Sequence, residues 1–425
     1  MKTKLSRILS ILLVSSLLLS ACGPGEAKSR LDRDVPDAAA RADLPELVAG
    51  NTAFALDLFQ AARSPEADLV FSPYSISLAF AMAYAGAQGD TAAQMAEVLH
   101  YSLPPERLHA AWNVLDQALA GRPEEAAWVD EQDRFRLHIA NAVWGQEDWP
   151  FEPAYLDRLA LDYGAGVRLV DFVGAPEAAR RQINDWVSEQ TRRRIRDIVP
   201  PGVVTPDTRL VLANAIYFKA TWQEEFDPDL TSADIFTLLD GSQVPVEMMS
   251  IGHGAGLPYA AGDGWQAVSL PYQGGLNEML VLLPDEGRFE EFSVGFAVDR
   301  YQAILDSMQV NSVILAMPKF TFESPLGLSD LLVGMGMPDA FDPLAADFSG
   351  IDGAQDLYIG DALHKAFVAV DEQGTEAAAA TVILMMMASA PVSEIQLTIN
   401  RPFLFFIRDV PSGTVLFLGQ VLDPR

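Results

Sequence analysis

Hydrophobic residues in the first third of the chain recur at helical spacing. Between Leu47 and Ala61, apolar residues return every three or four positions, which predicts an amphipathic helix. Ser75–Ala85 is a second apolar run, and the Ser72-Pro73 pair before it is typical of a helix start. A third helix is expected over Ala92–His100. This part of the chain therefore predicts several packed helices.

Later apolar runs are typical of buried strands. Near the C-terminus, Leu404–Arg408 and Val415–Val421 flank a short segment with Pro411 and Gly413, whose spacing predicts a hairpin turn. No internal repeat of about 20–50 residues is present. The pattern predicts an α+β fold with several sheets in one body. Four further runs rich in β-branched and aromatic residues predict strands, at Leu137–Trp144, Leu210–Lys219, Glu278–Leu283 and Val313–Phe322.

The first residues are typical of an export signal. Lys2, Lys4 and Arg7 form a basic start, and Ile8–Ser20 carries no charge. This run is too short to cross a bilayer, which needs about 20 residues, but it suits the apolar part of a signal peptide. It ends in Leu19-Ser20-Ala21-Cys22, which resembles a bacterial lipobox, where the cysteine receives a lipid. We therefore expect residues 1–21 to be a signal peptide and Cys22 to be the lipid attachment site.

Cys22 is the only cysteine in the chain. With a lipid on Cys22 no thiol remains, which excludes disulfides, zinc–thiolate sites and cysteine nucleophiles. The protein is then exported and held at the extracytoplasmic face of a bacterial membrane; an ordinary cleaved signal with a chance cysteine would leave it extracellular. Residues 22–44 are rich in Ala, Asp, Arg and Pro without apolar periodicity, so we expect a flexible tether followed by a single domain over 45–425.

Charge and missing motifs exclude several functions. A formal net charge of −29 repels a phosphate backbone, so nucleic acid is not an expected partner. Gly-x-Ser-x-Gly, His-Glu-x-x-His and phosphate-loop motifs are missing, so a hydrolytic enzyme is disfavoured and no catalytic residue is assigned. We expect no metal and no cofactor. No two of the five histidines have metal-ligand spacing on one helix: His100, His109, His138, His253 and His364.

The segment after the strand Ala366–Val370 is unusual, because it combines four consecutive alanines with an aliphatic run. As a strand, it would present one uncharged face that is able to pack inward and a second face that begins with the charged Glu376. Such a segment is suited to be a loop in one state and a buried strand in another, although an alanine-rich helix or a plain loop fits the composition equally well. The first face holds Thr375, Ala377, Ala379, Thr381, Ile383 and Met385, and the second holds Glu376, Ala378, Ala380, Val382 and Leu384.

At this segment the sequence resembles the serpin family. Glu372–Thr381 is similar to the hinge of inhibitory serpins, and Leu397–Ile407 is similar to the signature that follows their reactive loop. The resemblance extends from about Leu44 to Pro424. Further matching motifs are Phe71–Ser77, Asn214–Trp222, Leu270–Tyr272, Met317–Phe320, Asp347–Ile351 and Leu363–Ala366.

The resemblance implies both a fold and a mechanism. The fold would be α+β, with three β-sheets, about eight or nine helices and an exposed reactive-centre loop. A target serine protease would attack the loop and form a covalent acyl-enzyme, after which the cut loop would insert into the central sheet and trap the protease. The partner is thus a serine protease, and the free protein is expected to be a monomer with a tendency to polymerise through its loop.

Residue roles follow from the same resemblance. The reactive bond is expected at Ala388–Ser389, with Met387 as the alternative position for the cut. A small residue there favours elastase-like or subtilisin-like proteases. The hinge comprises Glu372, Gly374, Thr375, Glu376, Ala377, Ala378, Ala379 and Ala380.

Six further residues resemble those that control opening of the central sheet in serpins. Four are expected in a polar cluster beneath the sheet, Trp222 is expected at its top, and Lys319 is expected to pair with Glu372. None of them is catalytic. A non-inhibitory serpin, acting as a carrier or chaperone, is the alternative function, although the small hinge residues disfavour it. The six residues are Ser72, Ser75, Asn214, His364, Trp222 and Lys319.

Overall fold

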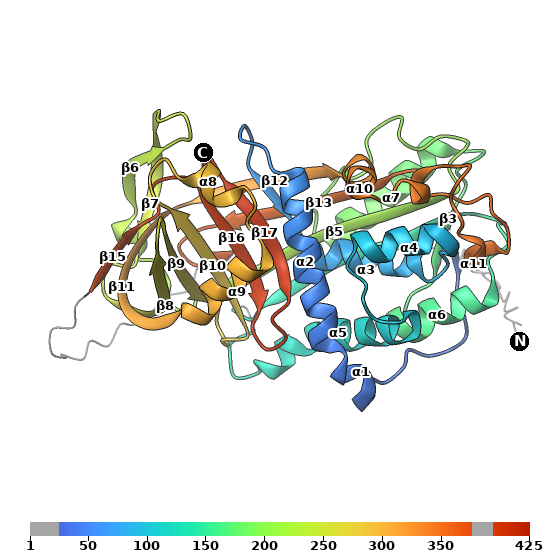
Figure 1. Ribbon diagram of the computed structural model, residues 1–425, viewed down its shortest axis with the longest axis horizontal. Helices are drawn as coiled ribbons and strands as arrows, with labels where there is room; N and C mark the ends of the chain where they lie inside the picture. The colour runs from blue at the N-terminus through green and yellow to red at the C-terminus, as the bar shows by residue number, and fades with distance from the viewer. Residues whose placement is uncertain (1–24, 132, 376–393) are drawn as a thin grey trace, which may run out of the picture.

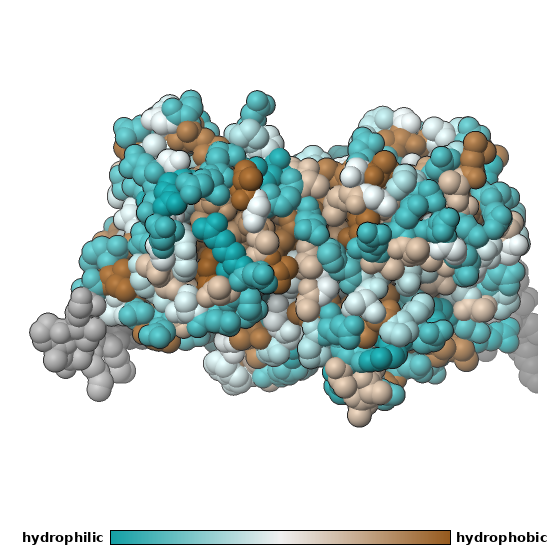
Figure 2. Space-filling model, viewed as in Figure 1, coloured by the Kyte–Doolittle hydropathy of each residue, from teal (hydrophilic) through white to brown (hydrophobic). Residues whose placement is uncertain are grey.

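The computed structural model describes residues 25–131, 133–375 and 394–425, which fold into two β-sheets with surrounding helices. The long strands run lengthwise through the molecule, with strands gathered at one end and helices at the other (Figure 1). Hydrophilic side chains are spread over the visible face, with hydrophobic ones between them (Figure 2). The α+β class expected from the sequence is confirmed.

A seven-stranded sheet forms the long axis of the molecule. Its central strand, β5 (Leu210–Thr221), is buried along nearly its whole length, in keeping with its almost continuous apolar sequence. Strand β5 pairs antiparallel with β3 and parallel with β13. In spatial order the sheet comprises β1 (Gly25–Ala27), β4 (Val167–Val170), β3 (Arg136–Gln146), β5, β14 (Gly374–Thr375), β13 (Ala362–Val370) and β12 (Phe320–Gly327).

The second sheet has ten strands. The family resemblance implies three sheets. Here β11 hydrogen-bonds to β8 through residues 309–313 and to β7 through residues 316–318, so it joins two of them into one continuous sheet. In spatial order this sheet comprises β2 (Leu69–Phe71), β17 (Val415–Val421), β16 (Phe403–Asp409), β10 (Asn277–Pro284), β9 (Trp265–Pro271), β8 (Ala255–Gly262), β11 (Gln309–Pro318), β7 (Gln243–Ser250) and β6 (Ser232–Thr237), with β15 (Ile395–Thr398) beside β11.

Helices cover both faces of the seven-stranded sheet. Helix α3 (Pro73–Tyr84) is buried against β3 and β5 on one side and β17 on the other. On the opposite face, α7 (Pro176–Gln190) and the residues after it form a second, smaller core. The other helices are α1 (Ala38–Ala42), α2 (Leu44–Ala62), α4 (Gly89–Val98), α5 (Pro105–Glu125), α6 (Pro153–Tyr163), α8 (Phe289–Ser293), α9 (Val298–Ser307), α10 (Leu328–Met335) and α11 (Ser349–Asp352), with 3-10 turns η1 (Pro228–Leu230) and η2 (Asp339–Phe341).

One run that was predicted as a single strand is divided in the structure. The run Val313–Phe322 is split at Lys319 between β11, in the ten-stranded sheet, and β12, in the seven-stranded sheet. The signature segment Leu397–Ile407 is shared by two strands, because β15 ends at Thr398 and β16 begins only after Pro402. The predicted C-terminal hairpin is present, with β16 and β17 antiparallel.

The expectation of a flexible tether over 22–44 is wrong from Gly25 onward. We call residues 25–43 the strap, because they lie along the body: β1 pairs antiparallel with the edge strand β4. The Arg33 guanidinium lies 2.7 Å from Asp116 and donates to Asn113 at 2.8 Å. Backbone pairing and ion pairs can hold a segment that has no apolar periodicity. The lack of periodicity in the strap therefore did not indicate a flexible chain. Among the described helices, none is long and apolar enough to span a membrane.

Candidate functional site

The hinge begins as a two-residue strand inside the seven-stranded sheet. In β14, Gly374 pairs with Thr221 and Thr375 pairs with Ala220 of β5, while Thr375 also pairs with Val370 of β13. Glycine is required at position 374, since a Cβ there would lie 2.1 Å from the Ala220 carbonyl oxygen. Only a hinge without a side chain at this point fits between the two strands.

Below the hinge, the same two strands pair directly with each other. We call this pairing the seam: residues 362–367 of β13 run parallel to residues 212–217 of β5. Its last pair is Phe367 and Tyr217, and we call the point beyond that pair the fork. The sheet is therefore shut along the seam and parted at the fork, where β14 lies between β5 and β13.

A tight turn delivers the hinge into the sheet. The Asp371 carboxylate accepts hydrogen bonds from the N–H groups of Gln373 and Gly374, at 2.9 and 3.2 Å. The Asp371 N–H donates to the Gly374 carbonyl at 3.0 Å. Burial raises the pKa of the Asp371 carboxyl. The turn fixes the direction in which the chain leaves β13.

Trp222 hydrogen-bonds to the backbone of this turn. Its indole N–H donates to the Asp371 carbonyl at 3.0 Å, and its backbone N–H donates to the Gln373 carbonyl at 2.8 Å. The fully buried indole stacks on Tyr272 with ring centroids 4.5 Å apart. The Tyr272 hydroxyl lies 2.8 Å from Thr375 Oγ1 and so contacts the hinge itself. Trp222 is at the top of the sheet, as expected from the sequence, and Tyr272 is a partner that was not assigned there.

The expected ion pair between Lys319 and Glu372 is present, with Nζ and Oε1 2.6 Å apart. Thr231 Oγ1 donates to the same carboxylate oxygen at 2.7 Å. Burial raises the pKa of Glu372, but the hydrogen bonds from Lys319 and Thr231 outweigh it, so the pKa lies below its ordinary value. The carboxylate is therefore ionised and fixes the start of the hinge to Lys319, which precedes β12, and to Thr231, which follows η1.

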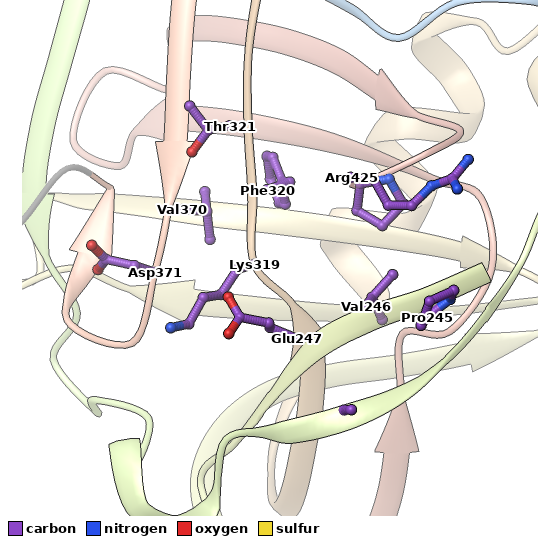
Figure 3. A pocket seen from close by; sticks show the side chains of 11 residues that line it. Pro245, Val246, Glu247, Lys319, Phe320, Thr321, Val370, Asp371 and Arg425 are labelled. Atoms are coloured by element: carbon purple, nitrogen blue, oxygen red, sulfur yellow. The ribbon is translucent and has the colours of Figure 1, made fainter.

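A cavity of about 540 Å³ opens beside this ion pair. Lys319, Glu247 and Asp371 line the end nearest the hinge, and Arg425 lies at the far side (Figure 3). Because Lys319 keeps 31% of its side chain exposed, water reaches one side of the ion pair. The hinge contacts are thus only partly shielded from solvent.

A buried polar cluster lies beneath the seam. The four residues expected there, Ser72, Ser75, Asn214 and His364, are in contact. Asn214 Nδ2 donates to Ser75 Oγ at 2.8 Å, and the Ser72 N–H donates to His364 Nε2 at 3.0 Å. Ser72 also caps α3, since its Oγ accepts from the Ser75 N–H at 3.1 Å. Because His364 and Asn214 are register partners across the seam, the cluster links its two strands.

One member of this cluster was missed in the sequence. Asn141 of β3 lies opposite Asn214, and its Oδ1 accepts from Asn214 Nδ2 at 2.6 Å and from Ser75 Oγ at 2.9 Å. The available signal was a polar residue, besides His138, inside the apolar strand that begins at Leu137. Asn141, Asn214 and His364 thus form a row of polar side chains across three neighbouring strands.

His364 is neutral within this cluster. Its Nε2 accepts the Ser72 N–H, and its Nδ1 faces Asn214 Oδ1, which requires the proton to be on Nδ1. Burial lowers the pKa of His364 to about 3. A proton on Nε2 would break the bond to Ser72 and place a charge on a buried ring.

The six residues grouped as sheet-opening form two sites. Ser72, Ser75, Asn214 and His364 lie beneath the seam, whereas Trp222 and Lys319 contact the hinge at the fork. The reactive bond Ala388–Ser389, its alternative Met387, the hinge positions Glu376–Ala380 and the lipid site Cys22 lie outside the described residues. Within the described ranges, no group of three or more His, Cys, Asp or Glu side chains is placed to hold a metal ion.

Comparison with known proteins identifies the family. Residues 49–424 match Serpin, the serine protease inhibitor family. The chain is 38% identical over 409 residues to an uncharacterized serpin-like protein of Thermococcus kodakarensis, covering 96% of this chain and 92% of the relative. It is 36% identical over 392 residues to leukocyte elastase inhibitor A of Mus musculus, covering 90% and 100%.

A solved structure agrees with the sequence relatives. The thermophilic serpin tengpin in its native state matches with a TM-score of 0.79 and 28% identity, covering 93% of this chain and 97% of that one. Fold and sequence thus lead to the same assignment: this chain belongs to the serpin family of serine protease inhibitors.

Proposed function

We propose that this protein inhibits serine proteases as a suicide substrate. The segment between Thr375 and Glu394 offers a bond to the protease, whose nucleophilic serine attacks the carbonyl carbon and displaces the amine, leaving an acyl-enzyme. The cut segment then enters the seven-stranded sheet between β5 and β13 and carries the protease with it. The complex is trapped because the protease is distorted before water hydrolyses the ester.

The observation that supports this mechanism best is the hinge strand at the fork. Since Thr375 pairs with Ala220 and the strands are antiparallel, continued insertion would bring Met385 opposite Leu210, at the end of β5. Ten further residues, 376–385, would then gain strand hydrogen bonds. At about 1 kcal/mol net for each residue, insertion releases on the order of 10 kcal/mol.

Side-chain size fits the same path. Thr375 is buried and contacts Tyr272, so alternate positions from Thr375 onward would face the main core. The next inward positions are Ala377 and Ala379, which add little volume to a packed interior. The charged Glu376 would face the opposite side. A hinge of this composition favours insertion over the carrier or chaperone alternative.

The proposed target class follows from the reactive bond. Cleavage after Ala388 presents a small side chain to the primary pocket, which suits elastase-like or subtilisin-like proteases. Cleavage after Met387 would favour a chymotrypsin-like or broad subtilisin-like enzyme. One relative carries the name leukocyte elastase inhibitor, which supports the elastase-like alternative.

We also propose a lipid on Cys22 that holds the inhibitor at the outer face of a bacterial membrane. The motif before Cys22 and the absence of any other cysteine in the sequence support it. Mass spectrometry of the membrane-extracted protein tests it: an N-terminal peptide with a diacylglycerol thioether is expected, and a free thiol on a secreted chain would overturn it.

The function is tested by mixing the purified protein with pancreatic elastase, subtilisin, chymotrypsin and trypsin. A covalent band at the summed mass on a denaturing gel is expected with elastase or subtilisin, and not with trypsin. Sequencing the released peptide then distinguishes Ala388 from Met387. Cleavage that leaves every protease free and active would favour the carrier or chaperone alternative.

A further inference from the structure

One large apolar side chain is left in solvent near the fork. All seven tryptophans of the chain lie in the described residues, and Trp128 alone among them is exposed, with 74% of its surface open to water. Because tryptophan gains a large apolar area from burial, proteins seldom leave its ring uncovered. Trp128 lies between α5 and β3, and we call residues 126–131 the Trp128 loop.

Contacts on both sides of Trp128 fix the shape of this loop. Its neighbours Ala126 and Val129 are buried. The Arg134 guanidinium donates to the carbonyls of Ala127 and Val129, each at 2.7 Å, and so closes the loop on either side of the indole. The backbone that displays the ring is therefore held in place, which reduces the conformational entropy that would be lost when a partner binds.

A short turn joins the Trp128 loop to the hinge. A Cβ on Gly274 would lie 3.1 Å from the Ala126 Cβ, so this turn packs directly on the loop. In the same turn, the Tyr272 hydroxyl lies 2.8 Å from Thr375 Oγ1. The indole is therefore displayed close to the point where the chain continues from Thr375 into the proposed reactive segment.

The surroundings of the indole are acidic. The nearby guanidinium groups are engaged by the protein itself, since Arg134 donates to the loop carbonyls and Arg122 donates to the buried Asp409. An apolar ring inside a negative rim is complementary to an apolar hollow with a basic rim on a partner. Residues 124–133 include no basic side chain and five acidic ones, which are Glu124, Glu125, Asp130, Glu131 and Asp133.

An enzyme bound at the reactive bond would be large enough to contact this surface as well. Ala388 lies thirteen residues beyond Thr375, a reach of at most about 45 Å. A serine protease of about 250 residues is itself about 45 Å across. The Trp128 loop is thus within the range of an enzyme that holds the reactive segment in its active site.

We propose that the Trp128 loop is a second contact surface for the target serine protease, with the indole in an apolar hollow of the enzyme and the acidic rim facing basic side chains. This inference rests on the proposed inhibitory function and extends it from the reactive bond to the outer surface of the enzyme. The loop selects among proteases that share a primary pocket. Those with a basic surface beside the active site associate faster and bind more tightly.

The test measures binding to pancreatic elastase and subtilisin whose nucleophilic serine is replaced by alanine, so that neither cleavage nor trapping occurs. With the enzyme that binds wild type more tightly, we expect Trp128→Ala to bind about tenfold more weakly, as for loss of one aromatic anchor, and Trp128→Phe to be intermediate. Leu344→Ala is the matched control. Leu344 is 96% exposed on the loop between η2 and α11, which is hydrogen-bonded to α4.

A second set of measurements tests the acidic rim. Asp130→Asn combined with Glu131→Gln is expected to slow association about threefold at low salt and to have little effect at high salt. Acetylation of the lysines of the enzyme should slow wild type in the same way, with no further loss for the double variant. Because these side chains are exposed, the unfolding temperatures of all variants should equal that of wild type, which separates a lost contact from a lost fold.

The possible outcomes are distinct. Equal affinities of wild type, Trp128→Ala and Leu344→Ala would overturn the second contact surface. Self-association of the free protein that disappears in Trp128→Ala, seen by light scattering, would also overturn it, because the occupant would then be a second copy. Weaker binding by Trp128→Ala in a protein that traps no active protease would support the surface and overturn only the proposed function. Covalent trapping of one enzyme at equal rates by wild type and Trp128→Ala would overturn the surface and leave the proposed function intact.

Discussion

The fork and the middle of the seam are closed by different kinds of contact. At the fork, Trp222 binds the backbone of the turn that begins at Asp371, and the ion pair between Lys319 and Glu372 is partly exposed. In the middle, buried side chains of His364 and Asn214 hold the two strands to each other. If more residues entered the sheet, as proposed, the contacts at the fork would persist, whereas those in the middle would have to separate. On this proposal, the loop would enter at the top of the sheet, and the main resistance to its insertion would lie below that point.

The largest expected effect is at the middle of the seam. Replacing Asn214 with Ala leaves His364 Nδ1 without a buried partner and removes the bonds of Asn214 to Ser75 Oγ and Asn141 Oδ1. We expect the native form to lose about 3 kcal/mol of unfolding free energy in urea denaturation, and the loop-cleaved form to lose less. The control is Asn184→Ala, since Asn184 is also buried but bonds Val199 away from the seam. An equal loss in native and cleaved protein would contradict a special role for this network.

Acid should weaken the same region. The pKa of His364 is about 3 in the folded protein and about 6.5 in an unfolded chain, so between these values only the unfolded state binds the proton. The stability that depends on neutral His364 is therefore fully present above pH 6.5 and decreases as the pH falls, and His364 alone accounts for a loss of about 2 kcal/mol at pH 5. Urea denaturation from pH 7 to pH 5 measures this slope.

A second buried histidine, His109, is the control for the pH dependence of the unfolding free energy. Burial also lowers the pKa of His109 to about 3, but its Nδ1 lies 2.6 Å from Tyr163 Oη, away from the seam. We expect His364→Gln and His109→Gln each to remove about half of the acid destabilisation. Only His364→Gln should change how acid affects the rate of conversion to the inserted form. The same change in that rate for both variants would show that the seam has no particular sensitivity to protons.

A smaller effect is expected at the fork. In Gly374→Ala the new Cβ would collide with the Ala220 carbonyl, so β14 should leave the sheet and lose the bond between Thr375 and Tyr272. We expect a loss of about 1–2 kcal/mol and faster hydrogen exchange at the Trp222 amide. The control is Gly360→Ala, where the nearest atom to a Cβ lies 3.9 Å away. Unchanged exchange at Trp222 would mean that the hinge strand tolerates a side chain.

The smallest effect is expected from the ion pair. Lys319→Met removes one of two partners of a partly exposed carboxylate, which should cost about 0.5–1 kcal/mol and make stability less sensitive to salt. Lys365→Met provides the control. Lys365 of β13 pairs with Glu323 of β12 at 2.8 Å, and this ion pair does not contact the hinge. If Lys319→Met lost as much unfolding free energy as Asn214→Ala, the seam would not be the stronger of the two regions.

Sequence reasoning located much of the fold and part of the site. The continuous apolar run of β5 and the turn between β16 and β17 each carry a local signal, and both elements were predicted. Residues of the polar cluster were found only through resemblance to a family, since nothing in the sequence places Ser72 beside His364. Asn141 was missed because its role depends on the strand register. Only the pairing of β3 with β5 sets it opposite Asn214. The strap was misjudged because its binding depends on backbone pairing and on Arg33 finding Asp116, which are visible only in three dimensions.

The strap also gives the molecule a direction. Through successive register partners, Gly25 lines up with Leu210 at one end of β5, whereas Gly374 lies beside Thr221 at the other. The eleven residue steps from Leu210 to Thr221 correspond to about 36 Å along the sheet. Cys22 precedes Gly25 by three residues, a reach of no more than about 10 Å. For a chain held by a lipid at Cys22, the hinge would therefore face away from the membrane, and a protease carried along the full sheet would travel back toward the bilayer.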